Sequence, residues 1–379
     1  RTLSYVKGRF GDYYRNADVP EPRAADEREW GYVVFGGGMV RHKSLLDLGS
    51  LETWLADEKP QHVYYSSARY DRPSAMNMND KEWKGADLIF DLDADHLRDA
   101  DPDDSYGTML SKCKDALLRL LAFIEDDFGF DDVQVVFSGG RGYHIHVYDD
   151  HVQRLGSDAR REVVDYVRGI GFEPELAFSG ETAEGSHGRK SPAKLRRLRG
   201  GAWGERVRDY ILDYVDEVTD MDDDDAVERL SSFENVGSRT AENLLEAFRN
   251  QRDEIAAGNL DVVGRATSFW DSLIEEAVEE TSAETDEPVT TDTRRLIRLP
   301  GSLHGGTGFE VVPLERHGVE EFDPLTDAVV FSDREQTVVA DEPWEFELKG
   351  RRFNMEEGEN TFPEYAAVFA MLRGDAELA

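Results

Sequence analysis

The sequence predicts an α+β protein in which a mixed β-sheet core is flanked by helices and interrupted by an inserted helical subdomain. Between residues 86 and 170 the apolar pattern indicates a strand, a helix, two strands and a helix, an order typical of a sheet backed by helices. Residues 203–280 have helical periodicity throughout, and strand-like runs resume from Pro288. The helical part therefore interrupts a β-rich body.

Four segments are expected along the chain. Residues 1–200 and 283–350 form the two parts of the body, 201–282 the helical insertion and 351–379 a helical tail. Helical spacing of apolar residues is found at 1–19, 110–124, 157–170 and 363–372. Strand-like runs are found at 29–35, 39–41, 62–65, 86–96, 133–137, 143–148, 296–299, 309–312, 328–331, 337–339 and 344–348.

The composition indicates a globular protein with a substantial core. The chain has 379 residues, of which 39% are hydrophobic, enough for two or three domains. Charges interrupt the most apolar runs, so no membrane span is expected. Cys113 is the single cysteine, which excludes an internal disulfide and fits a reducing cytoplasm. It lies in the apolar stripe of the 110–124 helix and is expected to be a core side chain.

The chain is strongly acidic, with 80 Asp and Glu against 44 Lys and Arg and a formal net charge of -36. Such a charge normally opposes nucleic-acid binding, which depends on Lys and Arg. The acid is dispersed, however, as in proteins that work in concentrated salt, where repulsion is screened within about 3 Å at roughly 1 M. We interpret it as adaptation to the solvent, so phosphate recognition must come from a few Arg and His residues and backbone amides.

Two stretches have more than one interpretation. Val236 and Gly237, followed by apolar residues at helical spacing, resemble a helix-hairpin-helix, but ordinary helix packing is the better explanation. The stretch 179–201 is either an exposed linker or a loop that tracks the phosphates of a nucleic-acid strand. Its basic residues are Arg189, Lys190, Lys194, Arg196, Arg197 and Arg199.

The central strand, Ala86 to His96, ends in carboxylates. Asp91 and Asp93 are two residues apart, so they point to the same side of a strand. Two neighbouring carboxylates repel each other unless a cation lies between them, which indicates Mg²⁺ or Mn²⁺ and half of a phosphoryl-transfer site. A strand that runs into an acidic loop is the alternative. An EF-hand fits poorly, because the sixth loop position is His96 and the twelfth is Pro102.

A Gly-rich segment, residues 138–146, connects two predicted strands. Its glycines let backbone amides approach an anion, Arg141 can bind phosphate oxygens in bidentate fashion, and His144 offers a further hydrogen bond. These are the parts of a triphosphate cradle, and a plain Gly-rich hairpin is the alternative. His144 and His146 also suggest zinc, but no further nearby ligands are evident.

A third segment, residues 294–308, repeats this composition, with Arg298 and His304 on either side of a Pro-Gly turn. A third carboxylate from this distant part of the chain would complete the metal site begun by the central strand. Asp286 and Asp292 are both candidates, and their spacing alone does not decide between them.

Together the three segments resemble the catalytic small subunit of archaeal and eukaryotic DNA primase. FDLDAD is similar to its paired-aspartate motif, SGGRGYHIHV to its Ser-Gly-x-x-Gly-x-His motif, and DEPVTTDTRRLIRLPGSLHGGTG to its third motif. The three occur in the family's order over most of the chain. The resemblance implies a primase-type catalytic fold, with residues 1–200 and 283–350 as the two parts of the catalytic domain.

The resemblance assigns roles to individual residues. It makes Asp91, Asp93 and Asp286 the catalytic carboxylates and the ligands of two Mg²⁺ or Mn²⁺ ions, and it favours Asp286 over Asp292. Asp95 is left as a solvated acid. Many relatives carry a Cys-rich zinc knuckle, which this chain cannot build, so no structural zinc is expected. The implied nucleotide contacts are Ser138, Gly139, Arg141, His144, Arg298 and His304.

The function that the resemblance implies is DNA-directed synthesis of short RNA primers on single-stranded DNA, by two-metal nucleotidyl transfer in the cytoplasm. The implied partners are the primase large subunit, the DNA template and nucleoside triphosphates, without a membrane. A repair or gap-filling polymerase of the same superfamily and a non-catalytic nucleic-acid-binding subunit are the alternatives.

Overall fold

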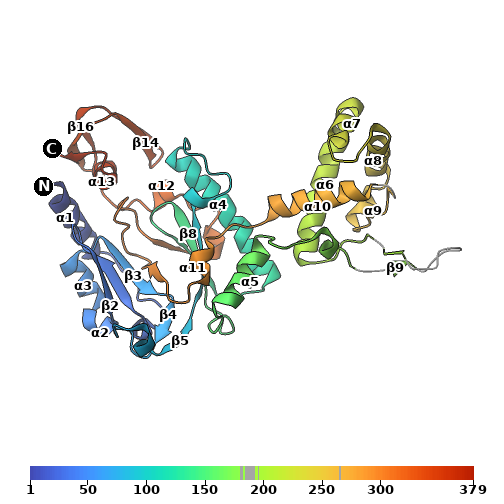
Figure 1. Ribbon diagram of the computed structural model, residues 1–379. Helices are drawn as coiled ribbons and strands as arrows, with labels where there is room; N and C mark the ends of the chain where they lie inside the picture. The colour runs from blue at the N-terminus through green and yellow to red at the C-terminus, as the bar shows by residue number, and fades with distance from the viewer. Residues whose placement is uncertain (180–181, 184–192, 195, 264–265) are drawn as a thin grey trace. The chain divides into compact units, whose positions relative to one another are not determined.

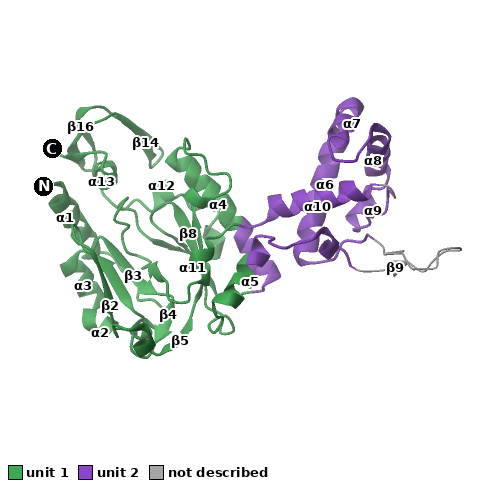
Figure 2. Cartoon of the chain, viewed as in Figure 1, with its two compact units in different colours: residues 1–118, 130–164, 284–379 green, residues 119–129, 165–283 purple. Residues whose placement is uncertain are grey.

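A computed structural model describes residues 1–179, 182–183, 193–194, 196–263 and 266–379 (Figure 1). The chain forms two compact units (Figure 2). Unit 1 consists of residues 1–118, 130–164 and 284–379, and unit 2 consists of 119–129 and 165–283. Arg189 and Lys190, part of the predicted basic stretch, lie outside the described residues.

Helices and antiparallel strands confirm the α+β class. None of the described helices combines the length and apolar character that a membrane crossing requires. The helices are α1 Thr2–Tyr14, α2 Leu45–Leu48, α3 Leu51–Glu58, α4 Tyr106–Ala122, α5 Ser157–Val167, α6 Ala202–Asp220, α7 Asp223–Ser231, α8 Ser238–Asn250, α9 Arg252–Ala256, α10 Thr267–Thr281, α11 Glu287–Thr291, α12 Pro324–Asp327 and α13 Glu364–Arg373. The strands are β1 Trp30–Val33, β2 Met39–Lys43, β3 His62–Ser66, β4 Ala68–Tyr70, β5 Trp83–Ala86, β6 Leu88–Asp93, β7 Val133–Phe137, β8 Gly142–Val147, β9 Thr182–Ala183, β10 Ala193–Lys194, β11 Leu296–Arg298, β12 Val312–Leu314, β13 Glu335–Ala340, β14 Trp344–Leu348, β15 Arg351–Met355, β16 Gly358–Pro363 and β17 Glu377–Leu378.

Two four-stranded sheets organise unit 1. One has the strand order β12-β7-β8-β6 and the other β11-β3-β1-β2. All strand pairings in the described residues are antiparallel. The pairing of β11 with β3 is long-range in sequence, because it sets Arg298 opposite Tyr64. Residues from both halves of unit 1 therefore meet in one sheet.

Helices α1, α3 and α13 bury their apolar faces in one core of unit 1. Phe10 and Tyr14 of α1 lie in this core with Leu55 of α3, Trp30 of β1 and Val368 of α13. Figure 1 shows α1 and α3 beside β2 and β3. The repeat of apolar residues every three to four positions explains why these segments are helices with one buried face.

The C-terminal helix α13 is fastened at its first residue, Glu364, whose carboxylate is buried. Glu364 Oε2 accepts hydrogen bonds from the Ser332 hydroxyl at 2.6 Å and the Ser332 amide at 3.2 Å. The Tyr5 hydroxyl donates to Oε1 at 3.2 Å, and Arg9 forms an ion pair at 3.4 Å. A buried carboxylate with four such partners ties α13 to α1 and to the loop before β13.

Helix α4 confirms the predicted apolar stripe. Leu110, Leu117 and Leu120 are buried with Cys113, which is 0% exposed. The Cys113 thiol donates weakly to the Leu92 carbonyl oxygen at 3.7 Å, and burial raises its pKa far above the usual range. Cys113 is therefore a core side chain, as predicted. A π-helical turn, Phe123–Asp127, follows α4.

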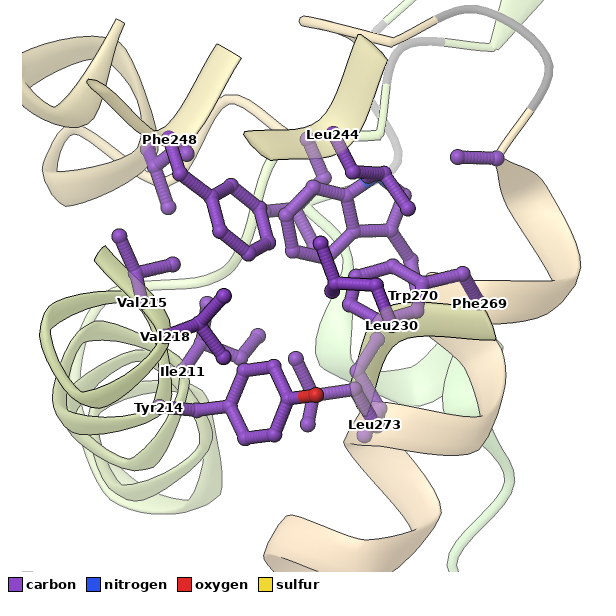
Figure 3. Close-up of a cluster of buried hydrophobic side chains, with 14 of the residues drawn as sticks. Ile211, Tyr214, Val215, Val218, Leu230, Leu244, Phe248, Phe269, Trp270 and Leu273 are labelled. Carbon is purple, nitrogen blue, oxygen red and sulfur yellow. The ribbon is translucent and has the colours of Figure 1, made fainter. Parts of the chain in front are cut away.

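The core of unit 2 is formed by α6, α7, α8 and α10 (Figure 3). Trp270 of α10 and Leu244 of α8 are fully buried in this core, and Val236 of the α7–α8 connection is buried with them. The helix-hairpin-helix pattern thus coincides with ordinary helix packing. The amide of Ala283 donates to the Val167 carbonyl oxygen at 2.8 Å, which ties the end of the inserted segment to its beginning.

Two of the arginines of the basic stretch, Arg196 and Arg199, have partners within unit 2. Arg196 forms an ion pair with Asp271, and its guanidinium lies over the Phe178 ring. Arg199 Nε donates to the Phe178 carbonyl oxygen at 2.8 Å. The ion pair of Arg196 with Asp271 balances part of the positive charge of this stretch, for which a linker and a phosphate-tracking loop were both considered.

Some expected elements differ from those observed. The strand predicted at 328–331 is wrong, because these residues form neither helix nor strand. The expected helical tail contains α13, but β15 and β16 precede that helix. The expected insertion, 201–282, covers most of unit 2, which also includes 119–129 and 165–200. Periodicity within one segment does not reveal which distant segment it packs against.

Candidate active site

The two aspartates of the central strand lie on one face of β6. Buried apolar residues alternate with the partly exposed Asp91 and Asp93, so both carboxylates project to the same side. β6 pairs with β8, and this register sets Asp91 opposite His144 and Asp93 opposite Gly142. One strand pair therefore joins the first predicted motif to the second.

Asp91 is held by His144 across this strand pair. The Nε2 atom of His144 lies 3.2 Å from Asp91 Oδ1. Burial alone raises the pKa of the Asp91 carboxyl, but His144 and the guanidinium groups of Arg295 and Arg298 outweigh burial and hold the pKa below its usual value. Asp91 is therefore ionised at neutral pH. Nδ1 of His144 is buried and has no hydrogen-bond partner among the described residues.

The loop between β7 and β8 is closed by its own hydrogen bonds. The Ser138 amide donates to the Gly142 carbonyl oxygen at 2.9 Å, and the Gly140 amide donates to Ser138 Oγ at 3.4 Å. Gly139 has a φ of +74°, a left-handed conformation that favours glycine. The loop therefore holds Ser138 in a fixed position at the wall of the pocket that Asp91 and Asp93 line.

Arg141, in the same loop, forms an ion pair with Asp95. The Arg141 Nη2 atom lies 2.6 Å from Asp95 Oδ2, and both side chains are exposed. The amide of Ala94 also donates to the Arg141 carbonyl oxygen at 3.1 Å. Asp95 is exposed beyond β6, as predicted, but it is also the ion-pair partner of a predicted phosphate-binding residue, which was not predicted.

Arg298 reaches the site from β11. Its Nη1 atom donates to His62 Nδ1 at 2.7 Å and to the Tyr64 hydroxyl at 3.1 Å. His62 and Tyr64 lie on the same face of β3, two residues apart. Burial and the charge of Arg298 lower the pKa of His62 to about 3, so the imidazole is a neutral acceptor.

The loop that carries His304 packs against the β7–β8 loop. The Thr307 hydroxyl donates to the Gly139 carbonyl oxygen at 2.6 Å, and the Gly306 amide donates to His304 Nδ1 at 3.2 Å. Burial and the charge of Arg298 hold the pKa of His304 well below its usual value. His304 is therefore neutral, with its proton on Nε2. The second and third motifs form one continuous structure.

Asp286 is joined to Asp91 through the backbone. The Asp286 amide donates to the Asp91 carbonyl oxygen at 2.8 Å, and the Thr285 hydroxyl donates to the same oxygen at 3.2 Å. Asp292 follows α11, and its Oδ1 accepts a hydrogen bond from the Arg294 amide at 2.8 Å. Of the two candidate third carboxylates, Asp286 is thus the one bonded to β6.

These elements enclose a pocket of about 230 Å³. Tyr64 and Arg295, which belong to none of the predicted site residues, contribute to its wall. A strand was predicted at 62–65, but no sequence signal indicated that this strand pairs with β11. The predicted residues that line the pocket are Asp91, Asp93, Ser138, His144 and Arg298.

The remaining predicted residues lie at or near the contacts around this pocket. Asp286 is attached to β6 by its amide, and Arg141 pairs with Asp95. A Cβ atom at Gly139 would lie 2.6 Å from His304 Cβ, so these two residues pack tightly together. The structure thus brings all three predicted motifs to one place.

The donor chemistry of the pocket fits a hard divalent cation. Asp91 and Asp93 supply carboxylate oxygens and Ser138 a hydroxyl, the ligand type that Mg²⁺ and Mn²⁺ prefer. In the described part of the chain, no three His, Cys, Asp or Glu side chains are grouped closely enough to hold a metal alone. The ring of His146 stacks with the rings of Tyr65 and Tyr148.

Fold and site define an α+β enzyme of the nucleotidyltransferase class, with paired carboxylates facing cationic and Gly-rich segments. The family model for the DNA primase small subunit matches residues 90–316. The chain is 50% identical to the DNA primase small subunit PriS of Haloarcula marismortui and of Natronomonas pharaonis, and 42% identical to that of Methanothrix thermoacetophila. These matches cover 100% of this chain and 98%, 99% and 99% of the respective relatives. The chain therefore belongs to the DNA primase small subunit family, the catalytic subunits of primase.

Proposed function

We propose that this chain synthesises short RNA primers on single-stranded DNA for replication. The observation that carries the proposal is that Asp91 and Asp93 share one pocket with Arg295 and Arg298. Carboxylates suit the cations that accompany a nucleoside triphosphate, and guanidinium groups suit its phosphates. Membership of the family, whose relatives are named primase small subunits, supports the same activity.

Asp91, Asp93 and Asp286 are proposed to hold two Mg²⁺ or Mn²⁺ ions, with water and substrate oxygens completing the coordination. When bound, such ions lower the pKa of the attacking 3′-hydroxyl and neutralise the departing pyrophosphate. Asp91 is suited to this role because its carboxyl stays ionised. The hydrogen bond from the Asp286 amide to the Asp91 carbonyl oxygen holds the backbone of residue 286 beside β6, which supports Asp286 as the third carboxylate.

The chain's own residues are proposed to bind and orient the triphosphate. The Ser138 hydroxyl and the Arg298 guanidinium line the pocket, where they can donate hydrogen bonds to phosphate oxygens. His144 holds Asp91 through Nε2. The His304 Nε2–H and the Gly139 amide are proposed as further donors at the adjoining loop. Arg141 joins them only after leaving Asp95, because both side chains are exposed and paired.

The family further implies a large primase subunit as partner and a DNA template, with the reaction in the cytoplasm. We propose this heterodimer without assigning its docking surface. The template path proposed from the basic stretch includes Arg189 and Lys190, which lie outside the described residues.

The direct test is incorporation of labelled NTPs on a single-stranded template at high salt, with and without Mg²⁺ or Mn²⁺, alone and with the large subunit. Asp93→Ala should abolish incorporation while the circular dichroism spectrum is unchanged. Asp103→Ala, which removes an exposed carboxylate of the same acidic region, should retain activity. Wild-type synthesis by Asp93→Ala refutes the metal assignment.

A second comparison separates primer synthesis from repair synthesis. The chain is offered either free NTPs and template or a preformed primer on the same template. Initiation from free NTPs supports the primase activity. Extension without initiation by the assembled heterodimer makes the chain a gap-filling polymerase, and neither reaction makes it a nucleic-acid-binding subunit.

A further inference from the structure

The Nδ1 atom of His62 contacts two segments of the candidate site, β11 and the loop that follows His304. Its Nδ1 accepts the hydrogen bond from Arg298 Nη1 at 2.7 Å and a second one from the Gly305 amide at 3.2 Å. Because both contacts use the Nδ1 lone pair, the imidazole proton lies on Nε2. One ring thus holds the side chain of Arg298 and the backbone of the loop that follows His304.

The loop cannot move away from His62 without losing tight packing. A Cβ atom at Gly305 would lie 2.2 Å from Gln61 Cγ and 2.8 Å from His62 Nε2. The Gln61 side-chain amide also donates to the Gly305 carbonyl oxygen at 3.2 Å. The rings of His62 and His304 meet edge to face, with centroids 5.1 Å apart. Only glycine at 305 permits this approach.

The neutral partners of Arg298 hold its guanidinium without forming a direct ion pair with it. Burial and the Arg298 charge lower the pKa of His62 to about 3, so the imidazole accepts a hydrogen bond without adding negative charge. The Tyr64 hydroxyl, the other partner of Nη1, is neutral too. In the described chain no carboxylate lies within 4.0 Å of the Arg298 nitrogens, whereas Arg28 and Arg141 pair directly with Asp87 and Asp95.

Neutral partners for Arg298 are unexpected by composition, because the chain has 80 Asp and Glu against 44 Lys and Arg. A carboxylate partner would orient a guanidinium equally well but would cancel the charge that attracts a phosphate. Histidine Nδ1 and a phenol orient Arg298 without adding a negative charge in direct contact with its guanidinium. The two neutral partners, His62 and Tyr64, therefore suit an arginine that binds polyphosphate at the wall of a pocket in an acidic protein.

We propose that His62 is a positioning residue that orients Arg298 and the His304 loop toward the triphosphate of the incoming nucleotide. The proposal rests on the proposed function of the same pocket. His62 acts through Arg298 and Gly305 and takes no part in bond making or breaking. This role requires that residue 62 place a neutral hydrogen-bond acceptor at the δ position of its side chain, where Nδ1 lies.

The requirement for an acceptor at the δ position can be tested with two substitutions of His62 by amide side chains. His62→Asn places an oxygen where Nδ1 lies, and His62→Gln places it near the Nε2 position instead. Binding of inorganic tripolyphosphate to the whole chain is measured by calorimetry for these variants, for His62→Ala, for Arg298→Ala and for the double variant. His317→Asn, at an exposed histidine of the same unit, is the matched control. Circular dichroism in the same high-salt buffer checks folding.

Expected is a loss of affinity of about tenfold for His62→Ala and His62→Gln, the scale of one hydrogen bond to a charged group. His62→Asn and His317→Asn should stay within about threefold of wild type. In the Arg298→Ala background, His62→Ala should lower the tripolyphosphate affinity by less than about twofold, because the guanidinium that His62 orients is absent. If His62→Ala does not fold, the Asn and Gln pair alone carries the comparison.

Equal affinities for His62→Asn and His62→Gln overturn the proposal, as do independent, multiplying losses for His62→Ala and Arg298→Ala. In primer synthesis, His62→Gln should raise KM for NTP more than it lowers kcat, and a fall in kcat alone overturns the positioning role. If wild-type chain makes no primers but the tripolyphosphate pattern holds, the proposed function fails while the role of His62 stands.

Discussion

Gly142 of β8 approaches the Leu92 carbonyl of β6 so closely that a Cβ atom at residue 142 would lie 1.9 Å from the carbonyl oxygen. No real Cβ contact is that short, and the obstructing atom belongs to the backbone of the strand between Asp91 and Asp93. The separation of β6 and β8 at the carboxylates therefore depends on the missing side chain at residue 142.

Gly142→Ala should accordingly push β8 away from β6 and lower NTP incorporation by about 100-fold or more, because a displacement near 1 Å at a catalytic group has that effect. The matched control is Gly38→Ala, where a Cβ atom meets nothing within 4 Å and activity should be retained. Incorporation rates and circular dichroism measure both effects. Full activity of Gly142→Ala contradicts the described packing.

The third carboxylate can be identified by comparing two neutral substitutions. Asp286→Asn should abolish incorporation and weaken Mn²⁺ binding, measured by electron paramagnetic resonance, because residue 286 is bonded to Asp91. Asp292→Asn should retain most activity, since its carboxylate accepts from the Arg294 amide and an amide oxygen can replace that contact. The reverse pattern assigns the metal to Asp292.

Asp95 should restrain the binding of nucleotide by Arg141. Asp95→Asn removes the ion pair at 2.6 Å, and exposed pairs contribute about 0.2–1 kcal/mol. We expect KM for NTP to fall by about two- to fivefold at low salt, with a smaller effect at high salt because screening already weakens the pair. Steady-state kinetics at two salt concentrations measure this. A rise in KM instead makes Asp95 a support for the loop.

Glu364 should make stability depend on pH. Burial alone raises the pKa of its carboxyl, but hydrogen bonds from Ser332 and the charge of Arg9 outweigh burial and hold the pKa below its usual value. Such a group stabilises the folded state above the unfolded pKa, about 4.3, and this contribution is lost as pH falls through the lower folded pKa.

Glu364→Gln should therefore lower the free energy of unfolding by about 1–2 kcal/mol at pH 7, and its difference from wild type should shrink below pH ~4. Denaturant unfolding at fixed high salt measures both values. Glu359→Gln, at an exposed position of β16, serves as control and should change little. A pH-independent difference would show that the charge of Glu364 is irrelevant.

Local pattern was enough to predict the elements that hold the site. The strand Val133–Phe137 agrees with its prediction residue for residue, and Asp91 and Asp93 share a face as their spacing required. These features follow from periodicity within one segment, which depends only on neighbouring residues. The same holds for the buried Cys113 in the stripe of α4.

The rest of the site depends on which distant segments pair. His62 and Arg298 are 236 positions apart in sequence, and only the β3–β11 register brings them together. Tyr64 and Arg295 were missed for the same reason, and so was the ion pair of Asp95 with Arg141, because the neighbours of these residues come from other strands and loops. The strand expected at 328–331 shows the converse, since a short apolar run need not find a pairing partner.

The hydrogen bond from Ala283 to Val167 has a consequence for how the chain folds. Bringing β11 to β3 requires closing a very long loop, and the entropy lost grows with the logarithm of loop length. Most of that loop is the inserted helical segment, whose helices form from contacts close in sequence, which is the faster kind of folding event. Once the hydrogen bond joins its two ends, the folded segment adds to the loop-closure entropy only as much as a short connection would. Early folding of unit 2 would therefore shorten the search by which Asp286 reaches Asp91.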